Sequence, residues 1–376
     1  MRDVYILGVS MIRFGRYPDR AVHELAADAA LLALDDAGMT IGDIEFLASG
    51  NLLQAGNMIG QRLLQQIGQT GIPVVNVANA CATGSTAFRD AYVAVGSGEF
   101  EIAMAVGSEQ MGKAGLLGGG PRGESVEGIL GSGLMPAVFG MAGVEHMRQF
   151  GTTAAHFARV AVKNHRHSVR NPLSQYQVEM TLEEVLQARM VAYPNTLYMC
   201  CPTGDGAAAA IVGSADVLKK YGAKPVRVAC SVLTSDPWTP RDLTMPDVST
   251  LTRNAARLAY ERAGIGPDDL DLVELHDCFA TAELLHYENL GLCTEGEAGR
   301  AVEEGWFEHG GRLPVNVSGG LLSKGHPLGA TGVANIFEVT THLRGAAGAR
   351  QVADAKVGMA HVIGLGSACT IHILTT

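Results

Sequence analysis

The stretch AGMTIGDIEFL at residues 37–47 decides the fold, because it returns as AGIGPDDLDLV at residues 263–273. Both copies begin with Ala-Gly, carry an aspartate a few residues later and continue into a strand-like run in the same register. A second pair, PVVNV at residues 73–77 and PVNV at residues 314–317, follows in the same order. Repeats in one order predict a βαβ-rich unit that is used twice around a pseudo-two-fold axis.

The residues around the first copy alternate between strand-like apolar runs and helical patterns. The strand-like runs are residues 4–9, 44–48, 73–78, 102–106 and 206–212, and the helical patterns are residues 22–37, 60–67 and 84–95. Such alternation predicts an α/β fold.

A different pattern separates the two copies. Residues 111–195 open on a Gly-rich turn at residues 118–121 and continue in irregular amphipathic pieces, which is typical of an inserted loop domain. We therefore expect an N-terminal half of residues 1–110 plus about 196–215, an inserted loop domain of residues 111–195, and a C-terminal half of residues 216–376.

The composition predicts a globular protein with a large core, since 47% of the 376 residues are hydrophobic and 18% are charged. A net charge of -10 without a basic stripe argues against nucleic-acid binding. The most basic stretch, residues 163–170, is interpreted as a solvated helix face that could at most hold a small anionic group. No apolar run reaches the ~18 residues of a membrane span and no secretory leader is recognisable, so we expect a cytoplasmic protein.

The seven cysteines lack the CxxC spacing of a zinc or redox site, so the sequence predicts no metal site and a reducing compartment. Cys81 differs from the others because it follows a predicted strand and precedes a predicted helix. A helix N-terminus offers unpaired N–H groups and partial positive charge, which would lower the pKa of the thiol. Cys81 is therefore a candidate nucleophile, with a buried structural cysteine as the alternative.

A second strand-to-helix loop carries the sequence NVSGGLLSKGHPLGATG at residues 316–332. His326 lies between a glycine and a proline, which restricts its backbone and leaves its side chain unobstructed. A Cys–His pair is what an acyl-thioester intermediate requires, so His326 is the candidate base for Cys81. We expect Ser318, Gly319 and Lys324 of the same loop to contact the substrate.

Two further loops carry polar or glycine residues at predicted strand ends. His276 and Cys278 follow the strand at residues 270–274, where open α/β sheets keep their sites, and they predict an acid/base and oxyanion-binding element. His361 and Gly364 belong to a loop whose glycine could bring backbone N–H groups close to a ligand. A tight turn between two final strands is the alternative interpretation of that last segment.

Together with CCPTGDGAAAA at residues 200–210, these loops resemble the thiolase superfamily, and most closely its sterol-carrier-protein-type branch. The resemblance covers nearly the whole chain. It implies a five-layered α-β-α-β-α thiolase fold, a homodimer or dimer of dimers, and acyl-CoA substrates with CoA as co-substrate. It implies no permanently bound cofactor.

The resemblance also assigns roles. Cys81 is acylated, His326 activates it, His276 joins His326 in a first oxyanion hole, and Cys81 with the Gly364 loop forms a second. The sequence departs from the main thiolase pattern in one place: Val362 stands where most thiolases carry an acid/base cysteine. Cys278 is then the candidate for the second proton carrier, as in the similar branch, and His361 is its rival.

The expected function is that of an acyl-CoA C-acyltransferase of lipid metabolism and β-oxidation, which cleaves a 3-oxoacyl-CoA with CoA or runs the reverse Claisen condensation. Three different functions are also compatible with this fold, since fold does not fix function. A condensing enzyme would carry His-Gly-Thr-Gly-Thr and Gly-Phe-Gly-Gly loops, which the chain lacks. A retro-aldolase would be expected to lose the Gly-His-Pro loop. A non-catalytic lipid-binding subunit would need no acid/base set. The resemblance also implies a possible zinc-ribbon/OB-fold partner. Because this chain has no cysteine quartet of its own, such a partner would be a separate protein.

Overall fold

The computed structural model describes residues 1–112, 134–221, 224–237, 248–365 and 367–376. Its centre is a nine-stranded mixed sheet in the order β3-β2-β4-β7-β1-β8-β11-β10-β9. The strands of this sheet are β1 (Val4–Met11), β2 (Phe46–Gly50), β3 (Val74–Val77), β4 (Ile102–Gln110), β7 (Asp205–Ser214), β8 (Arg227–Thr234), β9 (Leu272–Glu274), β10 (Val357–Gly364) and β11 (Ala368–Thr375).

The sheet consists of two equivalent halves that meet between β1 and β8. In the first half, β1 pairs antiparallel with β7, β7 antiparallel with β4, and β4 parallel with β2. The second half repeats this order: β8 pairs antiparallel with β11, β11 antiparallel with β10, and β10 parallel with β9. The joint itself is narrow, with Tyr5 paired to Arg227 and the Ile6 N–H donating to the Val226 carbonyl at 2.8 Å. The predicted α/β fold with a unit used twice is confirmed.

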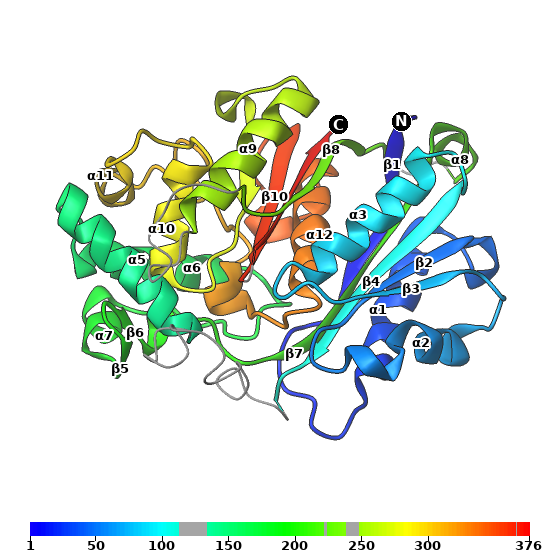
Figure 1. Cartoon of the computed structure of the whole chain (residues 1–376), viewed down its shortest axis with the longest axis horizontal. Helices are drawn as coiled ribbons and strands as arrows, with labels where there is room; N and C mark the ends of the chain where they lie inside the picture. Colours follow the sequence, from blue (N-terminus) through cyan, green and yellow to red (C-terminus); the bar gives the residue numbers. More distant parts are fainter. Residues whose placement is uncertain (113–133, 222–223, 238–247, 366) are drawn as a thin grey trace.

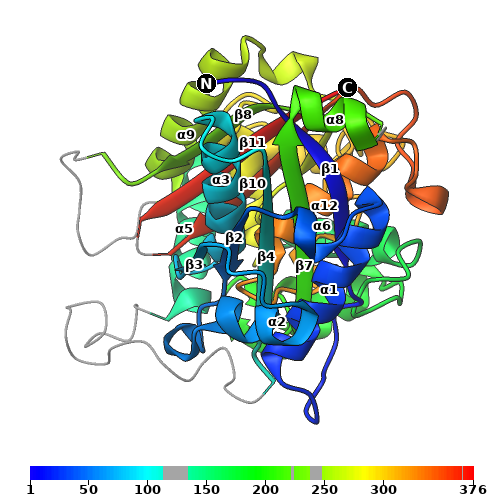
Figure 2. The same ribbon diagram turned by 90° about the vertical axis from the view of Figure 1, so that its right-hand side faces the viewer.

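Helices cover and separate the two halves, as Figures 1 and 2 show. Helices α3 (Thr83–Gly96) and α12 (Thr331–Leu343) lie side by side between them, α1 (Val22–Ala37) and α2 (Ile59–Ile67) lie outside the first, and α9 (Ser249–Ala263) and α10 (Ala280–Asn289) outside the second. Strand β4 is covered on both faces because its side chains alternate between them. Ala103 and Ala105 pack with α3 and α12, and Met104 on the other face packs with α1. This gives five layers, α-β-α-β-α.

The repeat that opened the sequence has the same local structure in both copies. Helices α1 and α9 end at Gly38 and Gly264, whose φ angles of 64° and 71° lie in the left-handed region that glycine tolerates. A 3-10 turn follows each, Ile41–Asp43 (η1) and Pro267–Asp269 (η4). The last aspartate of each turn accepts a backbone N–H at the turn's start, at 2.8 Å and 2.7 Å. The chain then enters β2 or β9.

The second repeated pair is less regular. Strand β3 runs parallel to β2, but its counterpart is a single parallel bridge between Val315 and Val273. The strand breaks at Asn316, which has a φ of 53°, and the Asn316 side chain accepts the Leu275 N–H at 2.9 Å in its place. The repeated sequence therefore marks equivalent positions in the two halves, although the second copy forms one bridge where the first forms the strand β3.

The region between the halves is more regular than expected. It contains two long helices, α5 (Met135–Phe150) and α6 (Ala154–Ser168), and a short one, α7 (Leu182–Gln187). The small elements are β5 (Met190–Ala192), β6 (Asn195–Thr196) and η3 (Leu197–Met199). The turn predicted at residues 118–121 lies outside the described residues, and the predicted domain bounds stay a prediction. Within the described part of the chain, no helix is long and apolar enough to cross a membrane.

Candidate active site

The Cys81 turn lies between β3 and the first turn of α3, as predicted. Ala80 has a φ of 47°, an uncommon conformation for a residue with a side chain, and strained backbone of this kind concentrates at functional sites. Thr83 holds the turn closed, because its hydroxyl accepts the Asn79 N–H at 2.8 Å and donates to the Ala80 carbonyl at 2.6 Å. The Cys81 side chain is buried beside α3.

His326 belongs to the loop between η5 (Gly320–Lys324), a π-helical turn, and α12. Its Nδ1 lies 2.7 Å from the hydroxyl of Thr331. We assign the proton of that hydroxyl to the Pro327 carbonyl at 2.9 Å, which makes the hydroxyl an acceptor towards the imidazole. The proton of neutral His326 is therefore on Nδ1, and Nε2, which is buried without a partner, keeps a free lone pair.

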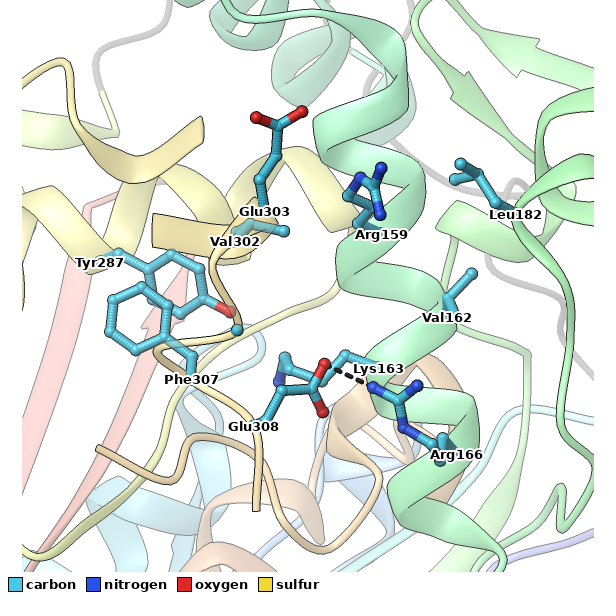
Figure 3. A pocket seen from close by; sticks show the side chains of 11 residues that line it. Arg159, Val162, Lys163, Arg166, Leu182, Tyr287, Val302, Glu303, Phe307 and Glu308 are labelled. Atoms are coloured by element: carbon cyan, nitrogen blue, oxygen red, sulfur yellow. Dashed lines mark hydrogen bonds and ion pairs between the residues drawn. The ribbon is translucent and has the colours of Figure 1, made fainter. Parts of the chain in front are cut away.

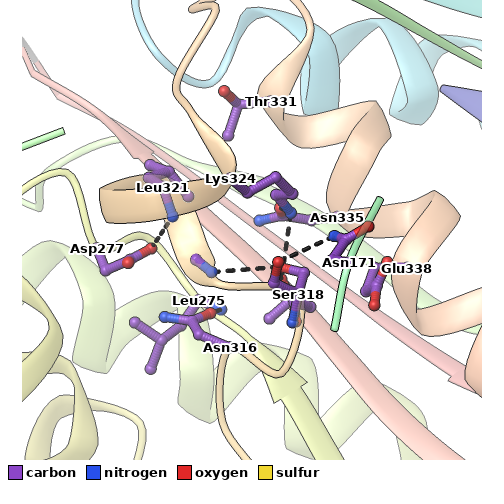
Figure 4. Close-up of polar contacts among 12 residues, drawn as sticks. Asn171, Leu275, Asp277, Asn316, Ser318, Leu321, Lys324, Thr331, Asn335 and Glu338 are labelled. Carbon is purple, nitrogen blue, oxygen red and sulfur yellow. Dashed lines mark hydrogen bonds and ion pairs between the residues drawn. The ribbon is translucent and has the colours of Figure 1, made fainter. Parts of the chain in front are cut away.

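His276 lies between β9 and α10, and its loop is tied to the His326 loop through the next residue. The Asp277 carboxylate accepts the Leu321 N–H at 2.7 Å (Figure 4). It also accepts the Leu322 N–H at 3.2 Å and the Asn164 side chain at 2.7 Å. Burial, then the neighbouring Glu283, raises the pKa of Asp277 well above its usual value. The buried carboxyl thus couples two loops and α6.

Three predicted residues meet in one place. The Sγ atom of Cys81 and one ring nitrogen each of His276 and His326 all lie within 4.8 Å of one another, and all three side chains are buried. The two imidazoles meet edge to face with ring centroids 5.2 Å apart. The candidate nucleophile and both candidate proton carriers or oxyanion donors therefore come from three loops that are distant in sequence.

The predicted lowering of the Cys81 pKa is wrong for this resting structure. Burial raises the pKa of the thiol to about 12, its own backbone N–H opposes that rise, and the charge of Glu109 adds to it. Burial also lowers the pKa of His326 to about 3, with Lys324 adding to the effect. Burial and three neighbouring imidazoles lower the pKa of His276 well below its usual value. A neutral thiol thus faces two neutral imidazoles, because desolvation outweighs the helix N-terminus.

His361 and Val362 point to opposite faces of β10, because side chains alternate along a strand. Val362 packs in the same cluster as Cys81. His361 faces α10: its ring lies 4.7 Å from that of His286, and its Nδ1 accepts the His276 backbone N–H at 3.4 Å. The segment predicted as a loop is strand up to Gly364, so the alternative of a turn between two final strands is the observed one.

Cys278 is buried two residues beyond His276, outside the cluster of three. Its carbonyl accepts the Cys201 N–H at 2.9 Å. Burial raises the pKa of its thiol well above the usual value, and the nearby Cys201 and Cys81 thiols contribute to this rise. Cys278 is thus buried near the cluster of Cys81, His276 and His326 but is not one of its members.

Gly364 lies against the Cys81 turn. A Cβ atom at this position would lie 2.8 Å from the Asn79 carbonyl oxygen and 3.1 Å from Cβ of Ala80. Only glycine therefore allows the end of β10 to approach the nucleophile turn this closely.

Ser318, Gly319 and Lys324 are turned into the protein (Figure 4). Ser318 donates to Glu274 at 2.5 Å, and Lys324 contacts Glu274 at 3.3 Å and Asn335 at 3.1 Å. Gly319 has a φ of 101°, and a Cβ there would lie 2.6 Å from Cβ of Ser168. All three hold the loop in shape, and their predicted contact with substrate stays a prediction.

Sequence reasoning missed Glu109 and Thr331. Glu109, at the end of β4, is fully buried and accepts the Leu52 N–H at 3.0 Å and the Asn51 side chain at 3.1 Å. Burial raises its pKa to about 7. An acidic residue that ends an apolar strand was the available signal for Glu109. Thr331 had no such signal, because its role depends on the conformation of the loop.

The basic stretch is not the predicted solvated face, since Lys163, His165 and His167 are buried. Lys163 and Arg166 line a cavity of about 170 Å³ between α6 and the segment after α11 (Ala298–Glu303), shown in Figure 3. Lys163 pairs with Glu283 at 2.8 Å, and Arg166 pairs with Glu308. Both charges are therefore already neutralised within the protein.

Comparisons with known proteins place nearly the whole chain among related sequences and folds. A model of the thiolase N-terminal domain matches residues 4–191, and one described as thiolase C-terminal domain-like matches residues 238–376. Sterol carrier protein 2 of Bos taurus is 41% identical, over 98% of this chain and 72% of its own. An acetyl-CoA acetyltransferase of Methanothermobacter thermautotrophicus is 39% identical over the full length of both chains. The solved Ltp2-ChsH2(DUF35) aldolase superposes with a TM-score of 0.83 at 24% identity, covering 98% of this chain and 97% of that chain.

Proposed function

The chain belongs to the thiolase family, and from that premise we propose that it is an acyl-CoA C-acyltransferase that carries the acyl group on Cys81. In the degradative direction it would cleave a 3-oxoacyl-CoA with free CoA, and in the other direction it would condense two acyl-CoA molecules. One observation carries the proposal: a ring nitrogen of His326 lies within 4.8 Å of the Cys81 thiol in the cluster of three, and Nε2 of that ring is buried without a hydrogen-bond partner.

The first half-reaction follows from that cluster. His326 Nε2 takes the thiol proton, and the Cys81 thiolate attacks the C3 carbonyl of the substrate. The bond between C2 and C3 then breaks, which leaves the shortened acyl group as a thioester on Cys81 and releases the enolate of the CoA thioester that holds C1 and C2. The resting thiol has a high pKa, so the proton would move as substrate binds and not before.

Oxyanion stabilisation draws on the same residues. Once protonated, His326 Nε2 becomes a donor beside His276, and both could bind a thioester oxygen. The Cys81 N–H and the backbone around Gly364 would serve the oxygen of the tetrahedral intermediate, since Gly364 lies against the Cys81 turn. Dipoles held in advance by a packed loop need no reorganisation during the reaction.

Cys278 is proposed as the second proton carrier. As a thiol it would protonate C2 of the departing enolate, and as the resulting thiolate it would take the proton from the attacking CoA thiol. Its raised pKa keeps it protonated at the start, as the first of these steps requires. The orientation of His361 towards α10, on the face of β10 opposite Val362, supports Cys278 over His361.

An aldolase is the second candidate, because the solved neighbour of similar fold is named as one. Such an enzyme would need no acyl carrier. The intact Gly-His-Pro loop and the clustering of His326 with Cys81 favour the acyltransferase. A condensing enzyme and a non-catalytic subunit are also compatible with the fold, and acylation of Cys81 would contradict a non-catalytic role.

We propose a homodimer that pairs through β3, with a dimer of dimers as the larger form. Among the described strands, β3 pairs with β2 alone, so its other edge is open, and Val75 on it is 41% exposed. Open apolar edges are usually covered. A separate zinc-ribbon/OB-fold partner, a cytoplasmic location and a part in β-oxidation stay predictions.

The decisive experiment combines a thiolysis assay over a panel of 3-oxoacyl-CoA chain lengths with intact-mass spectrometry. We expect CoA-dependent cleavage and an acyl adduct that maps to Cys81. Cys81→Ala should lose both signals while its melting temperature stays near that of the wild type. Undiminished thiolysis by Cys81→Ala, or an adduct on another cysteine, would refute the assignment.

A further inference from the structure

The resting active site has the donor set of a metal site. Within the part of the chain that the structure describes, Cys81, His276 and His326 are the one group of three or more ligand-type side chains whose donor atoms are all within 4.8 Å of one another. One thiol and two imidazoles match the sulfur and nitrogen ligands that zinc prefers, and no carboxylate belongs to the group.

Both imidazoles have lone pairs to offer. With the Thr331 hydroxyl assigned as the acceptor, His326 Nδ1 carries the proton, and Nε2 keeps a lone pair for a metal on a ring oriented by this outer hydrogen bond. Nδ1 of His276 is buried and has no hydrogen-bond partner. Buried polar atoms without partners are rare in folded proteins and call for an explanation.

We propose that the resting site binds Zn²⁺ through Cys81 Sγ, His326 Nε2 and a ring nitrogen of His276, with water as the fourth ligand. Binding would release the thiol proton of Cys81 to solvent, leaving a thiolate–zinc bond, with no change of oxidation state. A tetrahedral zinc with bonds of about 2.1 to 2.3 Å needs its donors roughly 3.5 Å apart. Because the donor atoms lie within 4.8 Å of one another, a contraction of at most about 1.3 Å suffices.

The ion would inhibit the enzyme reversibly. A zinc-bound Cys81 cannot be acylated, and an acylated Cys81 has no lone pair for zinc, so metal and acyl substrate exclude each other. This consequence rests on the proposed function, whereas metal binding itself does not. The sequence showed no such site because its three donors come from residues that are far apart in the chain.

The test uses the purified metal-free protein and Co²⁺ as a coloured substitute for Zn²⁺. We expect one equivalent to bind, with a thiolate-to-cobalt charge-transfer band that Zn²⁺ removes and Mg²⁺ does not. Cys81→Ala and Cys81→Ser should lose the band, and His326→Ala should weaken binding more than about 100-fold. Cys201→Ala, which removes a neighbouring buried thiol outside the cluster, is the matched control and should keep the band.

A second variant tests the outer hydrogen bond. Thr331→Val should weaken Co²⁺ binding about 10- to 100-fold, and Thr331→Ser should restore it. A band that survives in both Cys81 variants, or no binding by the folded wild type, would overturn the proposal. The cobalt band is measured without substrate. A protein that shows the band but no thiolysis would therefore contradict the proposed function and leave the metal site standing.

Discussion

Thr331 sets the tautomer of His326. The Thr331 hydroxyl lies 2.7 Å from Nδ1 of His326 and 2.9 Å from the Pro327 carbonyl, and with its own proton assigned to that carbonyl it accepts the imidazole proton. His326 lies in the loop before α12, and Thr331 is the first residue of that helix. Which nitrogen of His326 is basic is thus a consequence of how this loop turns into a helix.

Removal of that hydroxyl should slow the proposed acylation of Cys81 without moving the acyl group to another residue. Thr331→Val keeps the shape of the side chain but lets His326 adopt the other tautomer. We expect kcat for thiolysis to fall about 10- to 100-fold, less than the loss for His326→Ala, which removes the general base. Single-turnover acylation followed by rapid quench measures it, and Thr331→Ser should recover most of the rate.

A structural defect would give a different pattern in these variants. It would lower the melting temperature of Thr331→Val and Thr331→Ser alike and would leave the ratio of their acylation rates near one. An acylation rate in Thr331→Val equal to that of the wild type would show that the tautomer is not set by Thr331.

Cys278→Ala and His361→Ala should differ in the exchange of the substrate α-proton with solvent. Cys278→Ala should abolish exchange of the α-proton with deuterated solvent, because the proposed carrier for C2 is gone. His361→Ala should retain exchange and chiefly raise KM, since its ring faces α10 and supports the His276 backbone. Mass spectrometry of recovered acyl-CoA reads the deuterium content. Loss of exchange in His361→Ala alone would transfer the role to His361.

Glu109 should give the protein a pH-dependent stability. Its folded pKa of about 7 exceeds the ordinary value of 4.5, so its favourable contribution is complete below about pH 4.5 and is lost as pH rises through 7. The difference corresponds to about 3 kcal/mol between the two protonation states. Glu109→Gln cannot ionise, so its stability relative to the wild type should increase from pH 5 to pH 8, as measured by urea unfolding.

The difference in unfolding free energy between Glu109→Gln and the wild type reports on Glu109 alone, because both proteins contain the same buried histidines. His326, with a folded pKa of about 3, contributes in the opposite sense, since its favourable contribution is present above pH 6.5 and is lost as pH falls. That contribution is common to both proteins and cancels. Parallel pH profiles for the two proteins would contradict the assignment. Glu109→Gln should also speed alkylation of Cys81 at pH 8, because the charge of Glu109 raises the pKa of that thiol.

The open edge of β3 should mediate self-association. Val75→Lys places a charge on the edge, and two such charges would meet across a two-fold axis. Light scattering after size-exclusion chromatography should give the mass of a dimer for the wild type and of a monomer for the variant. Leu31→Lys, on the 51% exposed Leu31 of α1, is the matched control and should remain dimeric. A dimeric Val75→Lys would place the interface elsewhere.

The sequence by itself determined the repeated unit and the elements within it. Its alternation of strands and helices, and the glycines at positions 38 and 264, are local signals that depend on a few neighbouring residues. It also singled out Cys81, His276 and His326, because each lies in an unusual loop at the end of a strand-like run.

Only the tertiary structure decided how those residues behave. Burial is a property of the whole fold, and it raises the pKa of Cys81 where local reasoning from the helix N-terminus predicted the opposite. The roles of Thr331 and Glu109, and the inward orientation of Lys324, depend on contacts between segments that are distant in the chain or on the exact turn of one loop. A linear pattern carries no information on such contacts, because the distances between loops are set by the packing of the two halves.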